Sequence, residues 1–268
     1  MPQPYPPATG LTRRFVSITH FDETNSLEKE RAMAGRIAVV GGSSGIGEAI
    51  AGRLARQGLE VVIGGRGEER LHNARERLGG RVRAEVIDAG DAASVERFFE
   101  RVGPLEHLVI CLSGRKGAGP FATLSLEAVG EGFQEKVLPQ LRTAQVGLKR
   151  LAESGSITFI TAASARMVAP GAAGLAAING ALEAMVPTLA VELAPRRINA
   201  VSPGVIDTPW WNDVPGDIKT HYFEQSRATL PARRIGKPED VAAAVELLVG
   251  NTFMTGTVLE VDGGARLV

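Results

Sequence analysis

Short apolar runs alternate with amphipathic stretches along most of this chain, and this alternation restricts its possible folds more than any other feature. The apolar runs are predicted as strands over Arg36–Gly41, Leu59–Gly64, Val82–Ile87, Leu105–Leu112, Ser156–Thr161, Arg197–Val201 and Thr257–Val261. The stretches between them are predicted as helices over Gly45–Gln57, Glu68–Leu78, Ala92–Arg101, Leu126–Ala152 in two pieces, Ala172–Leu193 and Pro238–Leu248. Because strands that alternate with long helices form parallel sheets, the sequence predicts an α/β fold with a doubly wound parallel sheet of about seven strands.

The 268 residues fit one large α/β domain, because single domains of roughly 200–250 residues are common in this class. Residues 1–34 differ in composition from the rest, with prolines at positions 2, 4, 6 and 7, and we expect a mobile N-terminal extension there. Residues 35–268 are predicted to form a single domain.

The charges of the chain are balanced, with 30 Lys and Arg residues against 30 Asp and Glu residues. Nucleic-acid binding needs clustered positive charge, so we expect no nucleic-acid partner. No run approaches the ~18 apolar residues of a membrane-spanning helix, so we expect no membrane partner. Cys111 is the single cysteine, which excludes an internal disulfide and fits a reducing compartment such as the cytoplasm. No metal site is predicted.

A glycine-rich turn follows the first predicted strand, where Ile37–Val40 runs into Gly41-Gly42-Ser43-Ser44-Gly45-Ile46-Gly47 and then a helix. Gly41 allows a tight exit from the strand, Gly45 lets the backbone approach a pyrophosphate, and Gly47 permits close packing of helix on strand. The helix N-terminus offers unpaired N–H groups to phosphates. A ligand-free turn is the alternative, but the strand–turn–helix context predicts a Rossmann-type fold that binds a dinucleotide.

The spacing of this turn resembles that of the short-chain dehydrogenase/reductase family, whose pattern is Thr-Gly-x-x-x-Gly-x-Gly, with Val40 in place of the threonine. Further landmarks follow in the family's order: Asp88 at the end of the third strand, Cys111-Leu112-Ser113-Gly114 where the family has Asn-Asn-Ala-Gly, Asn199–Gly204 after the sixth strand, and Thr255–Gly264 at the C-terminus. The resemblance covers about residues 35–264. It implies a nicotinamide cofactor bound by Gly41, Ser43, Ser44, Gly45, Ile46, Gly47, Arg66, Asp88, Ala89, Ser113, Gly114, Asn179, Pro203, Gly204, Ile206 and Thr208.

The end of the second strand indicates which cofactor is bound. Sites that prefer NAD place an acid there for the ribose 2′-hydroxyl, whereas NADP sites place positive charge near the 2′-phosphate. This chain has Arg66 and no acid at that place, and a guanidinium suits a phosphate in bidentate geometry. A solvated loop arginine is the alternative. We therefore expect NADP(H).

The resemblance also implies a catalytic Tyr with a Lys four residues later, a Ser about thirteen residues before the Tyr, and an upstream Asn. The two tyrosines of this chain are Tyr5 and Tyr222, and Thr9 and Ser226 stand four residues after them. No Tyr-x-x-x-Lys motif is therefore present.

Alignment of Gly180–Glu183 and Val191–Pro195 with the family's helix places Leu175 at the Tyr position, Asn179 at the Lys position and Ala162 at the Ser position. The upstream Asn position falls near Lys136. A leucine cannot donate a proton, and an alanine methyl cannot bind an alkoxide. We therefore predict no standard catalytic residue in this chain.

Several polar residues are candidates to replace the missing groups, namely Thr161, Ser164, His221 and Tyr222. The last two lie in a predicted lid at about residues 208–230, which begins with the aromatic pair Trp210 and Trp211. Arg115 and Arg166 are candidates for an anionic ligand. Each has a structural alternative: strand-end capping for the hydroxyls, solvation for His221 and the arginines, and burial in a dimer for the tryptophans.

Two functions stay open at this point, with a third on the same scaffold. The first is an NADP(H)-dependent oxidoreductase that acts on a small carbonyl or alcohol through a non-standard proton donor. The second is a catalytically inactive NADP(H)-binding sensor or structural partner, and the third is a non-redox enzyme. The substrate cannot be named from the sequence. The resemblance implies a homodimer or homotetramer that assembles through the helices of Leu126–Ala152 and Ala172–Leu193.

Overall fold

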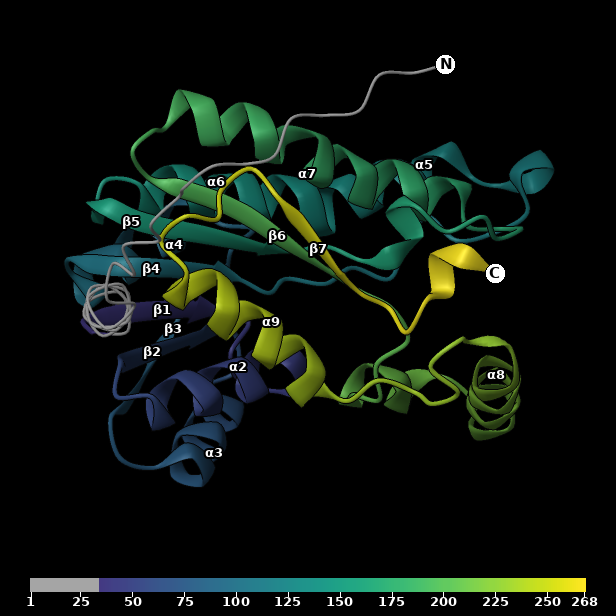
Figure 1. Cartoon of the computed structure of the whole chain (residues 1–268), viewed down its shortest axis with the longest axis horizontal. Helices are drawn as coiled ribbons and strands as arrows, with labels where there is room; N and C mark the ends of the chain where they lie inside the picture. The colour runs from purple at the N-terminus through teal and green to yellow at the C-terminus, as the bar shows by residue number, and fades with distance from the viewer. Residues whose placement is uncertain (1–33) are drawn as a thin grey trace, which may run out of the picture.

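The strands of the chain form one parallel sheet in the computed structural model, which describes residues 34–268 (Figure 1). The strands are β1 (Arg36–Val40), β2 (Glu60–Gly65), β3 (Val82–Val86), β4 (Leu105–Ile110), β5 (Leu151–Ile160), β6 (Arg197–Pro203) and β7 (Val258–Val261), in the order β3-β2-β1-β4-β5-β6-β7. The helices are α2 (Gly45–Arg56), α3 (Glu68–Leu78), α4 (Ala92–Val102), α5 (Leu126–Gly132), α6 (Leu138–Gly147), α7 (Ala173–Glu192), α8 (Gly216–Thr229) and α9 (Pro238–Gly250). The predicted seven-stranded, Rossmann-type fold is confirmed, whereas the extension expected over residues 1–34 lies, up to residue 33, outside the described residues.

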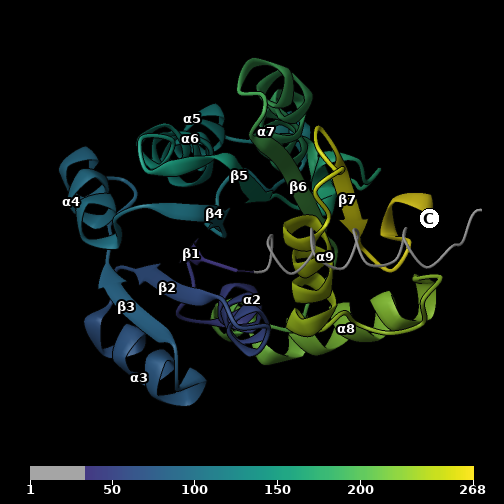
Figure 2. The same ribbon diagram turned by 60° about the vertical axis from the view of Figure 1, so that its left-hand side comes forward.

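Helices cover both faces of the sheet, because successive strand residues point to opposite sides. In β1, Val39 packs in one core cluster with residues of α2, α3 and α9, while Ala38 and Val40 pack in a second cluster with residues of α4, α6 and α7. Figure 2 shows α2 and α9 on one face and α4 and α6 on the other. The sheet is thus buried on both faces, which explains the continuous apolar runs of its central strands.

The centre of the sheet is the place where the chain reverses its direction of winding. β1 pairs with β2 through Val40 and Gly64 and with β4 through Val40 and Ile110. The chain builds β2 and β3 on one side of β1 and then crosses to build β4 to β7 on the other. The loops that leave β1 and β4 therefore separate at their carboxyl ends, and ligands of open α/β sheets bind in the crevice at such a switch point.

Three elements differ from the sequence prediction. β5 begins at Leu151 rather than Ser156, because Leu151 pairs with Leu105 before a register shift that precedes the His107–Ser156 pair. The two predicted helical pieces before β5 are α5 and α6, joined by a π-helical turn, Phe133–Val137. The segment after β6 contains α8, which the pattern missed because its polar sequence buries only Phe223 and Ser226.

The helix α7 is long and apolar enough to cross a membrane by length and composition, which the sequence expectation had excluded. Its placement in the fold explains that composition. Ile178, Leu182 and Val186 are buried along one side, and α7 lies against β6 and the π-helical turn. We therefore interpret α7 as a core helix of the sheet.

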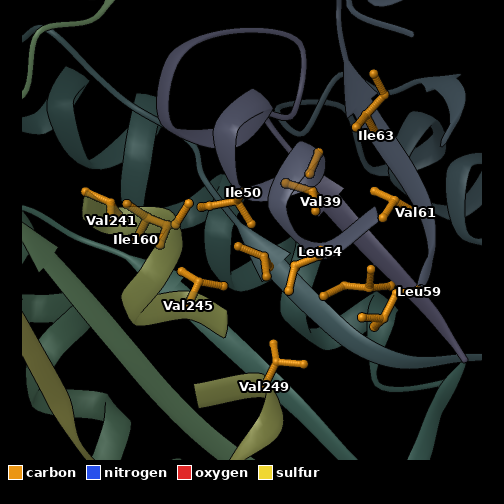
Figure 3. Packing of buried hydrophobic residues seen from close by; sticks show 14 of the residues in the cluster. Val39, Ile50, Leu54, Leu59, Val61, Ile63, Ile160, Val241, Val245 and Val249 are labelled. Carbon is orange, nitrogen blue, oxygen red and sulfur yellow. The ribbon is translucent and has the colours of Figure 1, made fainter. Parts of the chain in front are cut away.

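Removal of one core side chain should measure how much the packing of α2 on the sheet stabilises the fold. Leu54 is completely buried between α2 and the strands (Figure 3). We expect Leu54→Ala to lower the free energy of unfolding by about 2–5 kcal/mol, because it leaves a cavity as well as losing apolar burial. Urea unfolding followed by circular dichroism measures this. The matched control is Leu247→Ala, which removes an exposed leucine of α9, and an equal loss in both variants would contradict the prediction.

Candidate functional site

The turn after β1 is formed by glycines that other residues could not replace. A Cβ on Gly47 would lie 2.0 Å from the Gly41 carbonyl oxygen, so only glycine lets α2 approach the strand this closely. Gly45 has a φ of +54°, and a Cβ there would face the Thr208 side chain at 3.3 Å. The turn therefore brings the start of α2 opposite Thr208, in the segment that follows β6.

The N-cap side chain of α2 does not satisfy the backbone donors of the first helical turn. Ser44 stands at the N-cap in an extended conformation, but its side chain makes no capping hydrogen bond. The acidic residue of this turn, Glu48, is turned to Arg77, which donates to it at 2.8 Å. Unpaired N–H groups and the positive end of the helix dipole favour an anion at this place.

The predicted 2′-phosphate residue lies beside this turn. Arg66 follows β2 directly and is exposed, and within residues 34–268 its side chain forms no hydrogen bond or ion pair. Gly65 is close to the turn, since a Cβ on Gly65 would lie 3.1 Å from the Ser43 hydroxyl. The Arg66 guanidinium is therefore available to an anion held near Ser43 and the start of α2.

The ends of β3 and β4 form the neighbouring part of the same edge. Asp88 is exposed, and its Oδ1 accepts from the Gly90 N–H at 2.9 Å, which leaves its second carboxylate oxygen free of hydrogen bonds to the described residues. The Ala89 carbonyl is held by Arg142 at 2.9 Å. Beyond β4, Ser113 is exposed and Gly114 is half-buried. These residues can line one side of a bound ligand.

Asn179 on α7 has a buried acceptor without a partner. Its Nδ2 donates to the Ser164 hydroxyl and to the Leu175 carbonyl, both at 3.0 Å. The residue is 4% exposed, and its Oδ1 has no hydrogen-bond partner among the described residues. An unpaired buried acceptor is costly, so this oxygen suits a hydroxyl donor of a ligand. Leu175, one turn earlier, is half-buried, as is Ala162 at the end of β5.

A buried polar cluster around Lys136 and Glu183 was not predicted from the sequence. Lys136, in the π-helical turn, donates from Nζ to the Thr161 carbonyl at 3.1 Å. Glu183 on α7 accepts from the hydroxyls of Thr161 at 2.9 Å and Ser202 at 2.7 Å, and from Arg166 at 2.8 Å. Glu183 is thus a carboxylate with three donors, whereas Lys136 has no ion-pair partner in residues 34–268.

Burial decides the protonation chemistry of this cluster. It lowers the pKa of the Lys136 ammonium to about 8, although the neighbouring Cys111 and Glu183 oppose part of the shift. Burial also raises the pKa of the Cys111 thiol to about 12, which keeps that group neutral. Of these two groups, only Lys136 changes its charge near neutral pH.

The end of β4 is fixed to that of β5 by Gln140 on α6. Gln140 is fully buried and donates from Nε2 to the Leu112 and Ile160 carbonyls, both at 3.2 Å. Lys136 and Gln140 stand four residues apart on one helical stretch and so share a face, but this spacing does not indicate their burial. Both would have been assigned to the solvent by residue type alone.

The residues after β6 close the other side of the edge. Gly204 packs on the backbone of Asp262, where a Cβ would lie 2.7 Å from its Cα, and the preceding residue, Pro203, ends β6. Ile206 is buried in the core and accepts from the Trp211 indole at 2.9 Å. Thr208 faces Gly45 across the edge. Four of the residues predicted to bind the cofactor, Pro203, Gly204, Ile206 and Thr208, thus follow one another along one side of the crevice.

The segment of residues 208–230 forms a short 3₁₀ turn, Pro209–Asp213, and then α8, at the side of the sheet where β7 ends (Figure 1). Trp211 packs edge-on against Phe223, with ring centroids 5.1 Å apart. Arg115, from the loop after β4, lies 5.0 Å from the Trp210 ring centroid, donates to the Trp210 carbonyl and pairs with Asp213 at 2.7 Å. Arg115 therefore joins this segment to the β4 loop.

The structure places several of the candidate replacement groups away from the predicted roles. Arg166 pairs with Glu183 and Glu260, and the Thr161 hydroxyl is fully engaged by Glu183 and the Val201 carbonyl. Tyr222 stacks on Trp211, and burial raises the pKa of its phenol further. His221 is exposed on α8, and Ser164 accepts from Asn179. Of these side chains, Ser164 alone forms a hydrogen bond with a residue aligned with a catalytic position of the family, Asn179.

Both tryptophans of the chain lie in the 208–230 segment, so tryptophan emission reports on this segment. We expect Arg115→Ala to shift the emission to longer wavelength, because Trp210 loses the guanidinium that covers its ring. Fluorescence spectra of the folded protein measure the shift. Arg101→Ala, an exposed arginine on α4, is the control, and an unchanged spectrum in Arg115→Ala would show that this contact does not hold the segment.

Comparisons with known proteins agree with this geometry. A family model described as enoyl-(acyl carrier protein) reductase matches residues 40–266. The putative ketoacyl reductase 2 of the granaticin polyketide synthase of Streptomyces violaceoruber is 37% identical over 86% of this chain and 95% of its own length. The short-chain dehydrogenase/reductase ATR9 of Stachybotrys chlorohalonatus is 31% identical over 86% of this chain and 96% of its own length.

A solved structure shows the same fold. It is an NADPH-bound short chain oxidoreductase from Pseudomonas aeruginosa PAO1, described as containing an atypical catalytic center, with 27% identity and a TM-score of 0.77 over 85% of this chain and 95% of that one. The order of the strands, the glycine turn and these matches lead to one conclusion. The chain belongs to the short-chain dehydrogenase/reductase family.

Proposed function

We propose that this protein is an NADP(H)-dependent oxidoreductase that interconverts a small carbonyl compound and its alcohol. The observation that carries the proposal is the line of unpaired groups along one edge of the sheet. It runs from the Arg66 guanidinium, past the uncapped start of α2, to the buried Asn179 Oδ1. Their order matches the order of the 2′-phosphate, the pyrophosphate and the second ribose in a dinucleotide.

The individual contacts follow from this order. Arg66 would bind the 2′-phosphate, and the N–H groups of Gly45 and Ile46 would bind the pyrophosphate together with the hydroxyls of Ser43 and Ser44, whereas the Gly47 N–H contacts the Cys111 sulfur. Asp88 and Ala89 would border the adenine. Asn179 Oδ1 would accept from a ribose hydroxyl, with Ser113 and Gly114 close by. When bound, the reduced nicotinamide supplies a hydride.

The substrate pocket should be more apolar than is usual in the family. Leu175 and Ala162 stand at the positions that the alignment gives to the family's tyrosine and serine, and neither can bind a carbonyl oxygen. We therefore propose a small substrate with apolar substituents and a proton donor other than the family's tyrosine. The NADPH-bound oxidoreductase of Pseudomonas aeruginosa, which is described as containing an atypical catalytic center, supports a redox role without the usual residues.

A second function, an inactive NADP(H)-binding sensor or structural partner, is favoured by the same two substitutions, Leu175 and Ala162. It uses the cofactor site and needs no proton donor. We further propose a cytoplasmic homodimer or homotetramer. Val191 on α7 and Leu126 on α5 are exposed apolar residues on the helices expected to form that interface. The segment of residues 208–230 would act as the lid.

Titration with NADPH, NADH, NADP⁺ and NAD⁺ tests the cofactor site. We expect Arg66→Ala to weaken NADPH binding about ten- to hundredfold and to leave NADH binding unchanged, because a charged hydrogen bond to the 2′-phosphate is lost. Isothermal calorimetry measures both affinities. Arg75→Ala, farther along α3, is the matched control. Equal affinity of the wild type for NADPH and NADH would contradict the assignment of Arg66.

Turnover separates the two functions. We expect the wild type to oxidise NADPH in the presence of at least one apolar carbonyl compound of a panel that includes 9,10-phenanthrenequinone, cyclohexanone and ethyl acetoacetate. NADPH absorbance measures the reaction. Micromolar NADPH binding without oxidation on any member would favour the sensor, and the absence of binding would refute both functions.

A further inference from the structure

Lys136 occupies an unusual position for a cation. It projects from the π-helical turn that joins α5 to α6, a helix irregularity often found at functional sites. The residue is 7% exposed, and its Cβ would lie 3.6 Å from a Cβ on Gly114, at the end of the β4 loop. Its Nζ reaches the Thr161 carbonyl, which directly precedes Ala162. Lys136 thus stands where the ends of β4 and β5 meet.

We propose that Lys136 is the proton donor of the carbonyl reduction, in place of the family's tyrosine. It would act from its position beside the backbone of Thr161 and Ala162. This inference rests on the proposed function and names the residue that carries out its acid step.

The hydrogen bonds around Lys136 leave donors for such a step. An ammonium has three N–H donors, and within residues 34–268 one acceptor, the Thr161 carbonyl, is recorded for it. Glu183, the carboxylate that acts electrostatically on Lys136, accepts hydrogen bonds from Thr161, Ser202 and Arg166. A buried cation without an ion-pair partner holds its proton weakly, and a substrate oxygen would supply the missing acceptor.

The other polar groups at this edge are less suited to the step. A serine hydroxyl such as that of Ser164 is a weak acid, so it can pass on a proton only if a neighbouring acid supplies another one. The Asn179 amide does not titrate. Lys136 has a pKa of about 8, so it is mostly charged at neutral pH and close to the value that favours proton transfer.

In the proposed step, the substrate receives a hydride at carbon and a proton at oxygen. The carbonyl carbon gains the hydride that the reduced nicotinamide supplies, and the π electrons of the C=O bond move to oxygen. That oxygen forms a bond to a proton of Lys136 Nζ, whose N–H bond breaks and leaves a neutral amine. The product is the alcohol with the oxidised cofactor, and the amine regains its proton from solvent before the next turnover.

Proton release on binding of NADP⁺ tests the placement of Lys136 without a substrate. The oxidised nicotinamide is positively charged and should favour the neutral amine of a lysine next to it. Calorimetry at pH 8 in two buffers of different ionisation enthalpy should show release of up to about half a proton per site, since about half of Lys136 is charged there. Lys136 faces Cys111 and Glu183, with Arg166 behind Glu183, and the raised pKa of Cys111 keeps its thiol from titrating at pH 8.

The variants separate Lys136 from other sources of protons. Lys136→Met and Lys136→Arg should bind NADP⁺ without proton release, since methionine carries no proton and arginine does not lose one. Lys149→Met, which removes a surface lysine paired with Glu96, should behave like the wild type. Binding of NADP⁺ to the wild type without proton release would overturn the proposal.

Kinetics give the second test. On any carbonyl of the panel that the wild type reduces, kcat should be high below pH 8 and fall as pH rises through about 8, because reduction needs the protonated amine. Lys136→Met should lower kcat about 10²–10⁴-fold, lose this pH dependence and keep its NADPH affinity. A Lys136→Met variant with wild-type kcat and pH profile would refute the role of Lys136 alone, whereas a wild type that binds NADPH and reduces nothing would refute the proposed function as well.

Discussion

All seven strands run in the same direction, and the functional edge of the molecule depends on this one constraint. Parallel strands end at the same side of the sheet, so residues far apart in sequence, such as Arg66, Ser113, Ala162 and Thr208, are carried to one crevice. The change of winding at β1 opens that crevice. The bottom of the crevice is formed by closely packed backbone, since the approach of Gly47 to the Gly41 carbonyl leaves no room for a side chain.

The sequence predicts those parts of the structure that depend on local pattern. The apolar runs predict a doubly wound parallel sheet, because strands are recognised from the period of apolar residues. The glycine turn predicts where a cofactor would bind, because backbone sterics require glycine there. β5 was placed five residues late because Leu151 continues the apolar pattern of the preceding helix, while its pairing with Leu105 depends on a register shift. α8 was missed because one buried aromatic residue, Phe223, gives too weak a periodicity.

The electrostatics of the site could not be predicted in the same way. The alignment placed Lys136 near the family's asparagine but gave no indication of its burial, which depends on β4, β5 and α7 meeting around it. Likewise, Glu183 belongs to a residue type that is usually exposed on a helix such as α7. It is buried because Thr161, Ser202 and Arg166, from three other parts of the chain, donate to it together. Such cooperation between distant donors leaves no periodic signal in sequence, since buried charges are stable only once all partners are in place.

Arg115 links three segments that border the crevice. Its backbone N–H donates to Glu135, the neighbour of Lys136, and its side chain holds Trp210 and Asp213. The residue thus connects the Ser113–Gly114 wall, the π-helical turn and the aromatic segment. By thermodynamic reciprocity, whatever factor a dinucleotide at that wall adds to the affinity of a compound under the tryptophans is returned to the dinucleotide. Arg115 is therefore the contact through which two such binding equilibria would be coupled.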